Sequence, residues 1–137
     1  MTAISKSQER VSLTSLTEFL TKNPFPHPHT LGFFYREKMR AIHRIAPDLA
    51  LNNILEIGGG QGGLTALLYP QAQITNLDFN PDFADAPCNQ QPNVTFVCGD
   101  ATKLPFADCS FAAVTMFDVI EHIPSDRLAI AEAFRVL

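Results

Sequence analysis

Residues 54–62 read Ile-Leu-Glu-Ile-Gly-Gly-Gly-Gln-Gly, and this stretch decides the fold. The apolar run has the length of a strand buried in a parallel sheet, and residues 64–68 after the glycines read as the start of a helix. Glycine lacks Cβ, so the chain can turn tightly between strand and helix and let a ligand approach the backbone. We expect the N–H groups that begin this helix to be available to a polar or anionic ligand group. The pattern therefore predicts a nucleotide-type binding loop.

The glycine spacing fits two fingerprints at once. Residues 58–63 read G-x-G-x-x-G, as in dinucleotide-binding folds, and Asp78 lies about twenty residues further on, as that fingerprint requires. Residues 56–62 also read E-x-G-x-G-x-G, and in this pattern the chain resembles the class I S-adenosylmethionine-dependent methyltransferases. Glu56 favours the methyltransferase, because dinucleotide folds usually keep that position apolar.

Further motifs extend the resemblance in the same order along the chain. The predicted second strand ends in Asp78, and the predicted third strand ends in Gly-Asp-Ala at residues 99–101. Residues 104–111 read Leu-Pro-Phe-Ala-Asp-Cys-Ser-Phe, which matches the family's lead-in to the fourth strand. Residues 118–124 read Asp-Val-Ile-Glu-His-Ile-Pro, close to the family's Leu-Glu-His-Val-Pro, and residues 132–137 match the end of the helix that follows. Such an ordered series is far harder to obtain by chance than one glycine loop.

The resemblance implies an α/β, Rossmann-like fold with helices on both faces of a parallel sheet. The family's sheet has seven strands in the order 3-2-1-4-5-7-6, and this sequence supplies only the first four. We therefore expect a partial sheet of order 3-2-1-4 and the N-terminal part of a longer enzyme. Two parts are predicted: N-terminal cap helices over residues 1–50, and a cofactor-binding core over residues 51–137 that is incomplete at its C-terminal end.

The N-terminal part is predicted to contain two helices. One lies within residues 1–22, and the second runs over about residues 31–46, where a proline follows. Met39 and Ile42 belong to an apolar stripe with helical spacing, which predicts a face that packs on the core. The side chains at 33–36 either line the substrate side or belong to helices that merely cover the sheet.

The connection between the second and third strands departs from the full helix that the family normally has there. Asn80 is a good N-cap, and Pro81 suits the first helical position. Pro87 then limits this helix to about a turn and a half. We therefore expect the outer side of the sheet to be thinly covered at this point.

The resemblance also assigns roles to individual residues. Methyl transfer is an in-line displacement in which the cofactor already carries the activated group, so the protein mainly holds donor and acceptor in place. By family resemblance, Glu56 orients the loop or meets the methionine ammonium through water, and Asp78 holds the ribose. Phe79 packs on the adenine, residues 100–101 read the adenine edge, and Phe117 borders the methionine moiety. The predicted cofactor-binding residues are Glu56, Gly58, Gly59, Gly60, Gly62, Asp78, Phe79, Asp100, Ala101 and Phe117.

A cluster after the predicted fourth strand carries the candidate catalytic chemistry. Asp118-x-x-Glu121-His122 resembles the metal-binding E-x-x-E-H cluster of ubiquinone-pathway O-methyltransferases and small-RNA 2′-O-methyltransferases, where a metal could lower the pKa of a hydroxyl nucleophile. Many metal-free relatives carry the same Glu-His, and in them the histidine is a candidate base or a packed residue. We expect no metal, with Asp118, Glu121 and His122 as candidate ligands if one binds, and His122 as the candidate catalytic residue.

Composition narrows the location and the partners. The chain of 137 residues has a formal net charge of −4 at pH 7, which argues against a broad nucleic-acid footprint. No apolar stretch approaches the length that spans a membrane, and the N-terminus lacks a secretory hydrophobic region. The 3 cysteines form no C-x-x-C pair, so we expect reduced thiols of a cytoplasmic protein, with Cys98 as a small core residue.

We therefore expect a methyltransferase that uses S-adenosylmethionine and methylates a small-molecule acceptor. Two alternatives stay open. An NAD(P)-dependent Rossmann oxidoreductase would explain G-x-G-x-x-G but gives no account of Glu56 or of residues 99–106. A truncated, non-catalytic cofactor-binding or interaction module could instead self-associate through the open edge of the fourth strand.

Overall fold

The computed structural model describes residues 31–46 and 52–137. The helix predicted within residues 1–22 and the side chains at 33–36 lie outside this described part. The elements are α2 (Leu31–Ile45), β1 (Asn53–Ile57), α3 (Thr65–Leu68), β2 (Gln73–Asp78), β3 (Val94–Cys98), β4 (Ala113–Met116) and α4 (Asp126–Val136), with the 3-10 helices η2 (Pro81–Asp85), η3 (Pro87–Gln90) and η4 (Ile120–His122).

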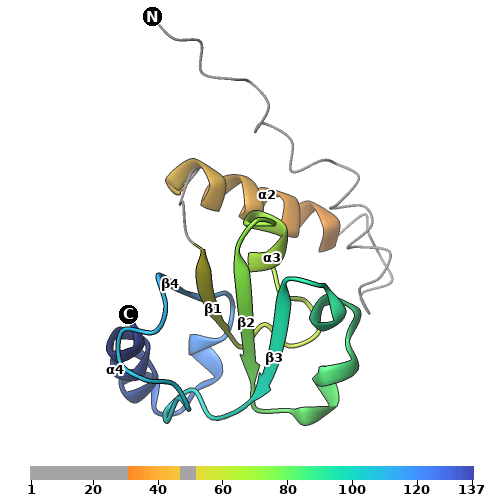
Figure 1. Cartoon of the computed structure of the whole chain (residues 1–137). Coiled ribbons are helices and arrows are strands. Elements are labelled where there is room, and N and C mark those ends of the chain that lie inside the picture. The colour runs from red at the N-terminus through yellow and green to blue at the C-terminus, as the bar shows by residue number, and fades with distance from the viewer. Residues whose placement is uncertain (1–30, 47–51) are drawn as a thin grey trace, which may run out of the picture.

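The strands form one sheet in the order β3-β2-β1-β4, which confirms the predicted order (Figure 1). Every neighbouring pair is parallel, and Ile54 of β1 lies opposite Ile74 of β2 and Ala113 of β4. Figure 1 shows the strands side by side, with β4 and β3 at the two ends. Because the strands are parallel, their carboxyl ends meet at one edge of the sheet, where open α/β folds bind ligands.

Alternate residues of the central strands are buried on opposite faces of the sheet. On one face, Leu55 and Leu77 belong to a core cluster with Val136 of α4. On the other face, Ile54 belongs to a second cluster, on which Ala66 of α3 packs. Burial of each of these aliphatic side chains stabilises the folded state by about 1.5–3 kcal/mol. Helices therefore cover both faces of the sheet, as predicted.

Helix α2 confirms the second predicted N-terminal helix. Met39 is buried and forms a cluster with Leu64 and Leu68, and Ile42 packs against the same cluster. The stripe that the helical spacing predicted is therefore the face that contacts the core. Over residues 31–46 and 52–137, no helix combines the length and the apolar character needed to cross a bilayer.

The connection from β2 to β3 contains η2 and η3 instead of an α-helix, and η2 ends before Pro87, as predicted. Asn80 caps η2, because its side-chain oxygen accepts from the N–H of Asp82 at 3.0 Å. The prediction of Cys98 as a core residue is wrong, since its side chain is exposed. Strand β3 lies at an edge of the sheet, so its side chains have neighbours on fewer sides than those of β1 and β2.

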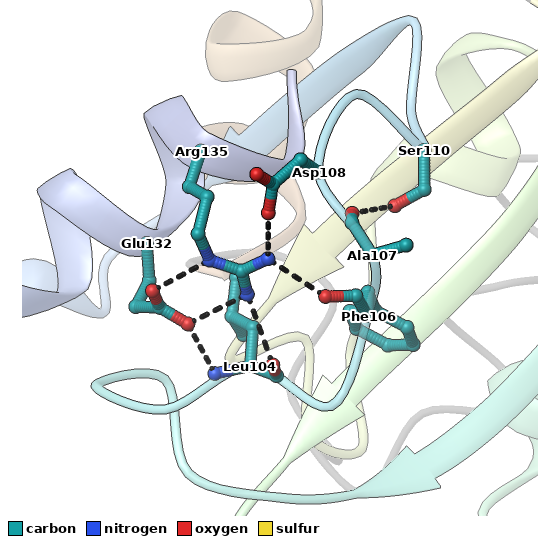
Figure 2. A network of polar contacts seen from close by, with 7 residues as sticks. All are labelled: Leu104, Phe106, Ala107, Asp108, Ser110, Glu132 and Arg135. Atoms are coloured by element: carbon teal, nitrogen blue, oxygen red, sulfur yellow. Dashed lines mark hydrogen bonds and ion pairs between the residues drawn. The ribbon is translucent and has the colours of Figure 1, made fainter.

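Figure 2 shows how α4 holds the segment that leads into β4. The Arg135 guanidinium donates to Glu132 through Nε and Nη2, at 2.8 Å each. Its Nη1 donates to Asp108 at 2.7 Å and to the carbonyl of Phe106 at 2.8 Å. Glu132 also accepts from the N–H of Leu104 at 2.8 Å. These charge-assisted hydrogen bonds join a helix to a loop that lacks regular structure of its own.

Candidate cofactor-binding site

A cleft of about 500 Å³ opens at the carboxyl ends of β1 and β2. Its walls come from the glycine loop after β1, the end of β2, η2 and the segment after β4. The residues that line it are Glu56, Gly58, Gly59, Gly60, Gln61, Gly62, Leu64, Asp78, Phe83, Phe117, Asp118 and His122. The cleft therefore brings together most of the predicted cofactor-binding residues and the candidate catalytic histidine.

The glycine loop has the tight geometry that its sequence predicted. Gly58 and Gly60 have φ values of 75° and 51°, in the region that favours glycine. A Cβ on Gly58 would lie 2.1 Å from a methyl carbon of Val119. A Cβ on Gly59 would lie 2.4 Å from the side-chain oxygen of Asn76. Neighbouring side chains thus pack so closely on the loop backbone that larger residues do not fit at these positions.

Glu56 organises the loop from inside the protein. Its side chain is buried, and its carboxylate accepts from the N–H of Leu64 at 2.9 Å and of Thr65 at 3.2 Å. Burial raises the pKa of Glu56, and these two N–H groups counteract part of that effect. Glu56 thus binds the backbone that follows the glycines, which supports the predicted loop-orienting role. That role and contact with a methionine ammonium both stay predictions.

The same contacts correct the prediction for the helix that follows the loop. Helix α3 has only 4 residues, and the N–H groups of Leu64 and Thr65 bind the Glu56 carboxylate. These two donors are therefore not available to a ligand. The side chain of Glu56 takes the place that an anionic ligand group was expected to occupy.

Asp78 ends β2 and is 6% exposed. Its Oδ1 accepts from the N–H of Asn80 at 3.0 Å, so this oxygen stabilises the turn into η2. Its Oδ2 faces the glycine loop, since a Cβ on Gly60 would lie 3.5 Å from that oxygen. Asp78 is thus a turn carboxylate with a second oxygen at the cleft, and its predicted contact with a ribose stays a prediction.

The predicted adenine-binding residues lie outside the cleft. Phe79 is 81% exposed, and neither Asp100 nor Ala101 is among the lining residues. Asp100 accepts from the N–H and the hydroxyl of Thr102, at 2.8 and 2.7 Å, and these bonds lower the pKa of Asp100. Because β2 and β3 are neighbours in register, all three predicted residues follow strands that end at the same edge of the sheet. Their contact with adenine stays a prediction.

The segment after β4 forms the remaining wall. Phe117, Asp118 and His122 line the cleft, whereas Glu121 does not. Asp118 has a φ of 50° and forms an ion pair with Lys38 of α2. Within the described ranges 31–46 and 52–137, no group of three His, Cys, Asp or Glu side chains is arranged to hold a metal ion. The three candidate ligands therefore do not converge on one point.

Sequence reasoning missed three lining residues, Gln61, Leu64 and Phe83. The ring of Phe83 lies beside the glycine loop, because a Cβ on Gly60 would lie 3.5 Å from its Cε2. The capping signal at Asn80 could have placed Phe83 on a short helix. It could not have shown that this helix folds back onto the loop.

The chain is similar to known methyltransferases over most of its length. A family model described as "Methyltransferase domain" matches residues 55–137. The chain is 32% identical over 97 residues to a ubiquinone/menaquinone biosynthesis C-methyltransferase, UbiE, of Desulfotalea psychrophila, with 67% of this chain and 39% of the relative covered. It is 37% identical over 111 residues to a phthiotriol/phenolphthiotriol dimycocerosates methyltransferase of Mycobacterium tuberculosis, with 74% of this chain and 40% of the relative covered.

Solved structures show the same fold. The crystal structure of the YcgJ protein from Bacillus subtilis matches with a TM-score of 0.66 at 28% identity, covering 74% of this chain and 46% of that one. The matched part thus spans less than half of each of these proteins. The matched family model agrees with the strand order and with the E-x-G-x-G-x-G pattern of the glycine loop. The chain therefore belongs to the class I S-adenosylmethionine-dependent methyltransferase family.

Proposed function

We propose that the chain binds S-adenosylmethionine in the cleft and supports transfer of its methyl group to a small-molecule acceptor. The observation that carries the proposal is the convergence of the glycine loop, Glu56 and Asp78 on one cleft at the carboxyl ends of β1 and β2. Two similar proteins are named for ubiquinone/menaquinone biosynthesis and for phthiotriol dimycocerosates. These names support a small-molecule acceptor for this chain as well.

The residues present fit such a cofactor. Asp78 turns an oxygen that Asn80 does not use toward the cleft, and a carboxylate oxygen suits the hydroxyl donors of a ribose. The loop backbone at Gly60, beside Asp78 and Phe83, carries no side chain that would hold a ligand away. Phe83 supplies an apolar wall beside them. When bound, the cofactor supplies an activated methyl group, and these residues hold it in place.

The acceptor is expected on the side of the cleft that the segment after β4 forms. His122 is exposed there, and an imidazole can take a proton from an acceptor as it is methylated. Phe117 packs against the cluster of Met39 and Leu64, so this wall is continuous with α2. We assign His122 as the candidate base and α2 to the cap of the site.

The net charge and the free cysteines support a cytoplasmic enzyme that acts on a small molecule. The described cysteines, Cys88, Cys98 and Cys109, are free thiols, which are typical of reducing compartments. The net charge of −4 disfavours a nucleic-acid acceptor. We therefore place the proposed reaction on a small molecule in the cytoplasm.

Isothermal titration with S-adenosylhomocysteine tests the proposal, with NADH as the control ligand. We expect saturable binding of S-adenosylhomocysteine alone. Asp78→Asn should weaken it roughly 10- to 100-fold, since a hydrogen bond to a charged group contributes about 1.5–3 kcal/mol. Asp85→Asn, at an exposed aspartate that ends η2, is the matched control and should leave the affinity unchanged. Saturable binding of NADH, or equal affinity in the Asp78 variant, would contradict the proposal.

A further inference from the structure

Two buried asparagine side chains lie beneath the glycine loop. Asn76 of β2 is 1% exposed, and Asn89 of η3 is 5% exposed. The Asn76 amide donates to Asn89 Oδ1 at 2.6 Å. The Asn89 amide donates in turn to the carbonyl of Gly60 at 2.9 Å and to the carbonyl of Phe83 at 2.8 Å. One buried amide therefore joins two walls of the cleft, the glycine loop and η2.

The orientation of both side-chain amides follows from these partners. The carbonyls of Gly60 and Phe83 can only accept, so the NH₂ group of Asn89 must face them and its oxygen must face Asn76. Asn76 then offers its own NH₂ group to Asn89. This turns the Asn76 oxygen toward Gly59, where it has no hydrogen-bond partner.

Packing alone does not account for an asparagine at position 76. A buried acceptor without a partner lowers stability, and an apolar side chain on the same strand would avoid that cost. Asn76 instead binds the side chain of Asn89, and Asn89 in turn donates to the Gly60 carbonyl and so orients it. Gly60 has a φ of 51°, so its peptide orientation depends on contacts of this kind.

We propose that Asn76 and Asn89 are positioning residues that hold the glycine loop and Phe83 in a binding-competent arrangement before any ligand arrives. Neither side chain lines the cleft, so both act through the groups that they hold. Ordering these walls in advance reduces the conformational entropy that a ligand must remove on binding. The effect on affinity rests on the cofactor-binding function proposed above, whereas the ordering of the loop does not.

Two measurements on Asn89→Ala, Asn76→Ala and the double variant test this inference. Amide hydrogen exchange of the ligand-free protein reports on the loop, in particular on the N–H of Gly62, which donates to the Gly59 carbonyl at 2.9 Å. Titration with S-adenosylhomocysteine reports on affinity. We expect Asn89→Ala to speed exchange in the loop roughly tenfold and to weaken binding roughly tenfold, as the loss of two neutral hydrogen bonds implies. Asn76→Ala should have a smaller effect, and the double variant should resemble Asn89→Ala.

Asn93→Ala is the matched control. The Asn93 amide also donates to two backbone carbonyls, those of Ala72 at 3.0 Å and Pro70 at 3.4 Å, but before β3 at the opposite end of the sheet. We expect this variant to lower the melting temperature and to leave loop exchange and affinity unchanged. If Asn89→Ala does not fold, Asn76→Ala provides the test, because it leaves both donors of Asn89 in place.

The two proposals fail in different ways. Unchanged loop exchange in the folded variants would overturn the positioning role, whatever the wild-type protein binds. A second outcome is that the variants show faster loop exchange although the wild type does not bind S-adenosylhomocysteine. This outcome would support the positioning role and contradict the proposed cofactor. If Asn93→Ala weakened binding as much as Asn89→Ala does, that would also count against the inference, since a general loss of stability would then explain the result.

Discussion

Glu56 is a single buried side chain that binds the backbone where the glycine loop ends. Its position near the end of β1 places the carboxylate under the first residues after the glycines, where two backbone N–H groups point at it. A Cβ on Gly63 would lie 3.0 Å from its Oε2, so the loop also leaves little space around this group. The acidic residue of the E-x-G-x-G-x-G pattern is therefore part of the protein interior as well as of the cleft wall.

The raised pKa of Glu56 leads to a pH prediction at this residue. Above the ordinary value of 4.5 the folded protein binds more protons than the unfolded chain, so the stability contributed by this group falls as the pH rises through this range. Glu56→Gln does not titrate there. We expect the wild type to lose stability relative to this variant as the pH rises above 4.5, measured by urea unfolding. Parallel pH dependence of the two proteins would contradict the prediction.

At the scale of elements, the contact between α4 and the segment before β4 depends on one arginine. Glu132 and Arg135 are three residues apart on the helix and lie on the same face, so they form a pair that also reaches the loop carbonyls (Figure 2). Asp108 is mostly exposed, and we expect its ion pair with Arg135 to contribute less than the half-buried partners do. The network fixes the loop that connects the third and fourth strands.

Glu132→Gln should destabilise the protein in a pH-dependent way. The bond to Arg135 lowers the pKa of Glu132 to about 2 from the ordinary 4.5. The stabilising contribution is therefore complete above pH 4.5 and is lost as the pH falls toward 2. We expect the difference in melting temperature between wild type and variant to be largest at neutral pH and to disappear toward pH 2. Glu121→Gln, at an exposed glutamate of η4, is the control and should change the melting temperature little at any pH.

At the scale of the whole molecule, the sheet has an open edge. In the part of the chain that the structure describes, β4 pairs with β1 and with no further strand. Helix α4 also exposes Ile130 and Phe134, by 54% and 80%, one turn apart. An unpaired strand edge and exposed apolar side chains both favour association between chains.

We therefore expect the 137-residue chain to self-associate as its concentration rises, measured by size-exclusion chromatography with light scattering. Ala112→Lys adds a charge at the exposed residue that precedes β4 and should shift the chain toward the monomer. Gln73→Lys adds the same charge at the exposed start of the interior strand β2, and we expect no such shift. A wild-type protein that stays monomeric at every concentration would rule out pairing through this edge.

Local patterns predicted a large part of this molecule. The run before the glycines predicted β1, and the capping signal at Asn80 with the limit at Pro87 predicted the short helix η2. These features follow from hydrogen-bonding capacity and allowed dihedral angles of neighbouring residues, which the sequence contains directly. The strand order and the roles of Glu56 and Asp78 came from the resemblance, and the order is confirmed.

Tertiary structure alone decided which distant side chains meet. Nothing local to Asn76 and Asn89 predicts their bond, and nothing local to Phe83 places its ring beside Gly60. The exposure of Cys98 likewise depends on β3 being an edge strand. The sequence by itself therefore determined the elements, the binding loop and the family. The tertiary structure decided that Asn76 and Asn89 meet beneath the loop and that Glu56 accepts the N–H groups expected to bind a ligand. These groups come from separate segments of the chain, and only the assembled sheet sets the distances and orientations between them.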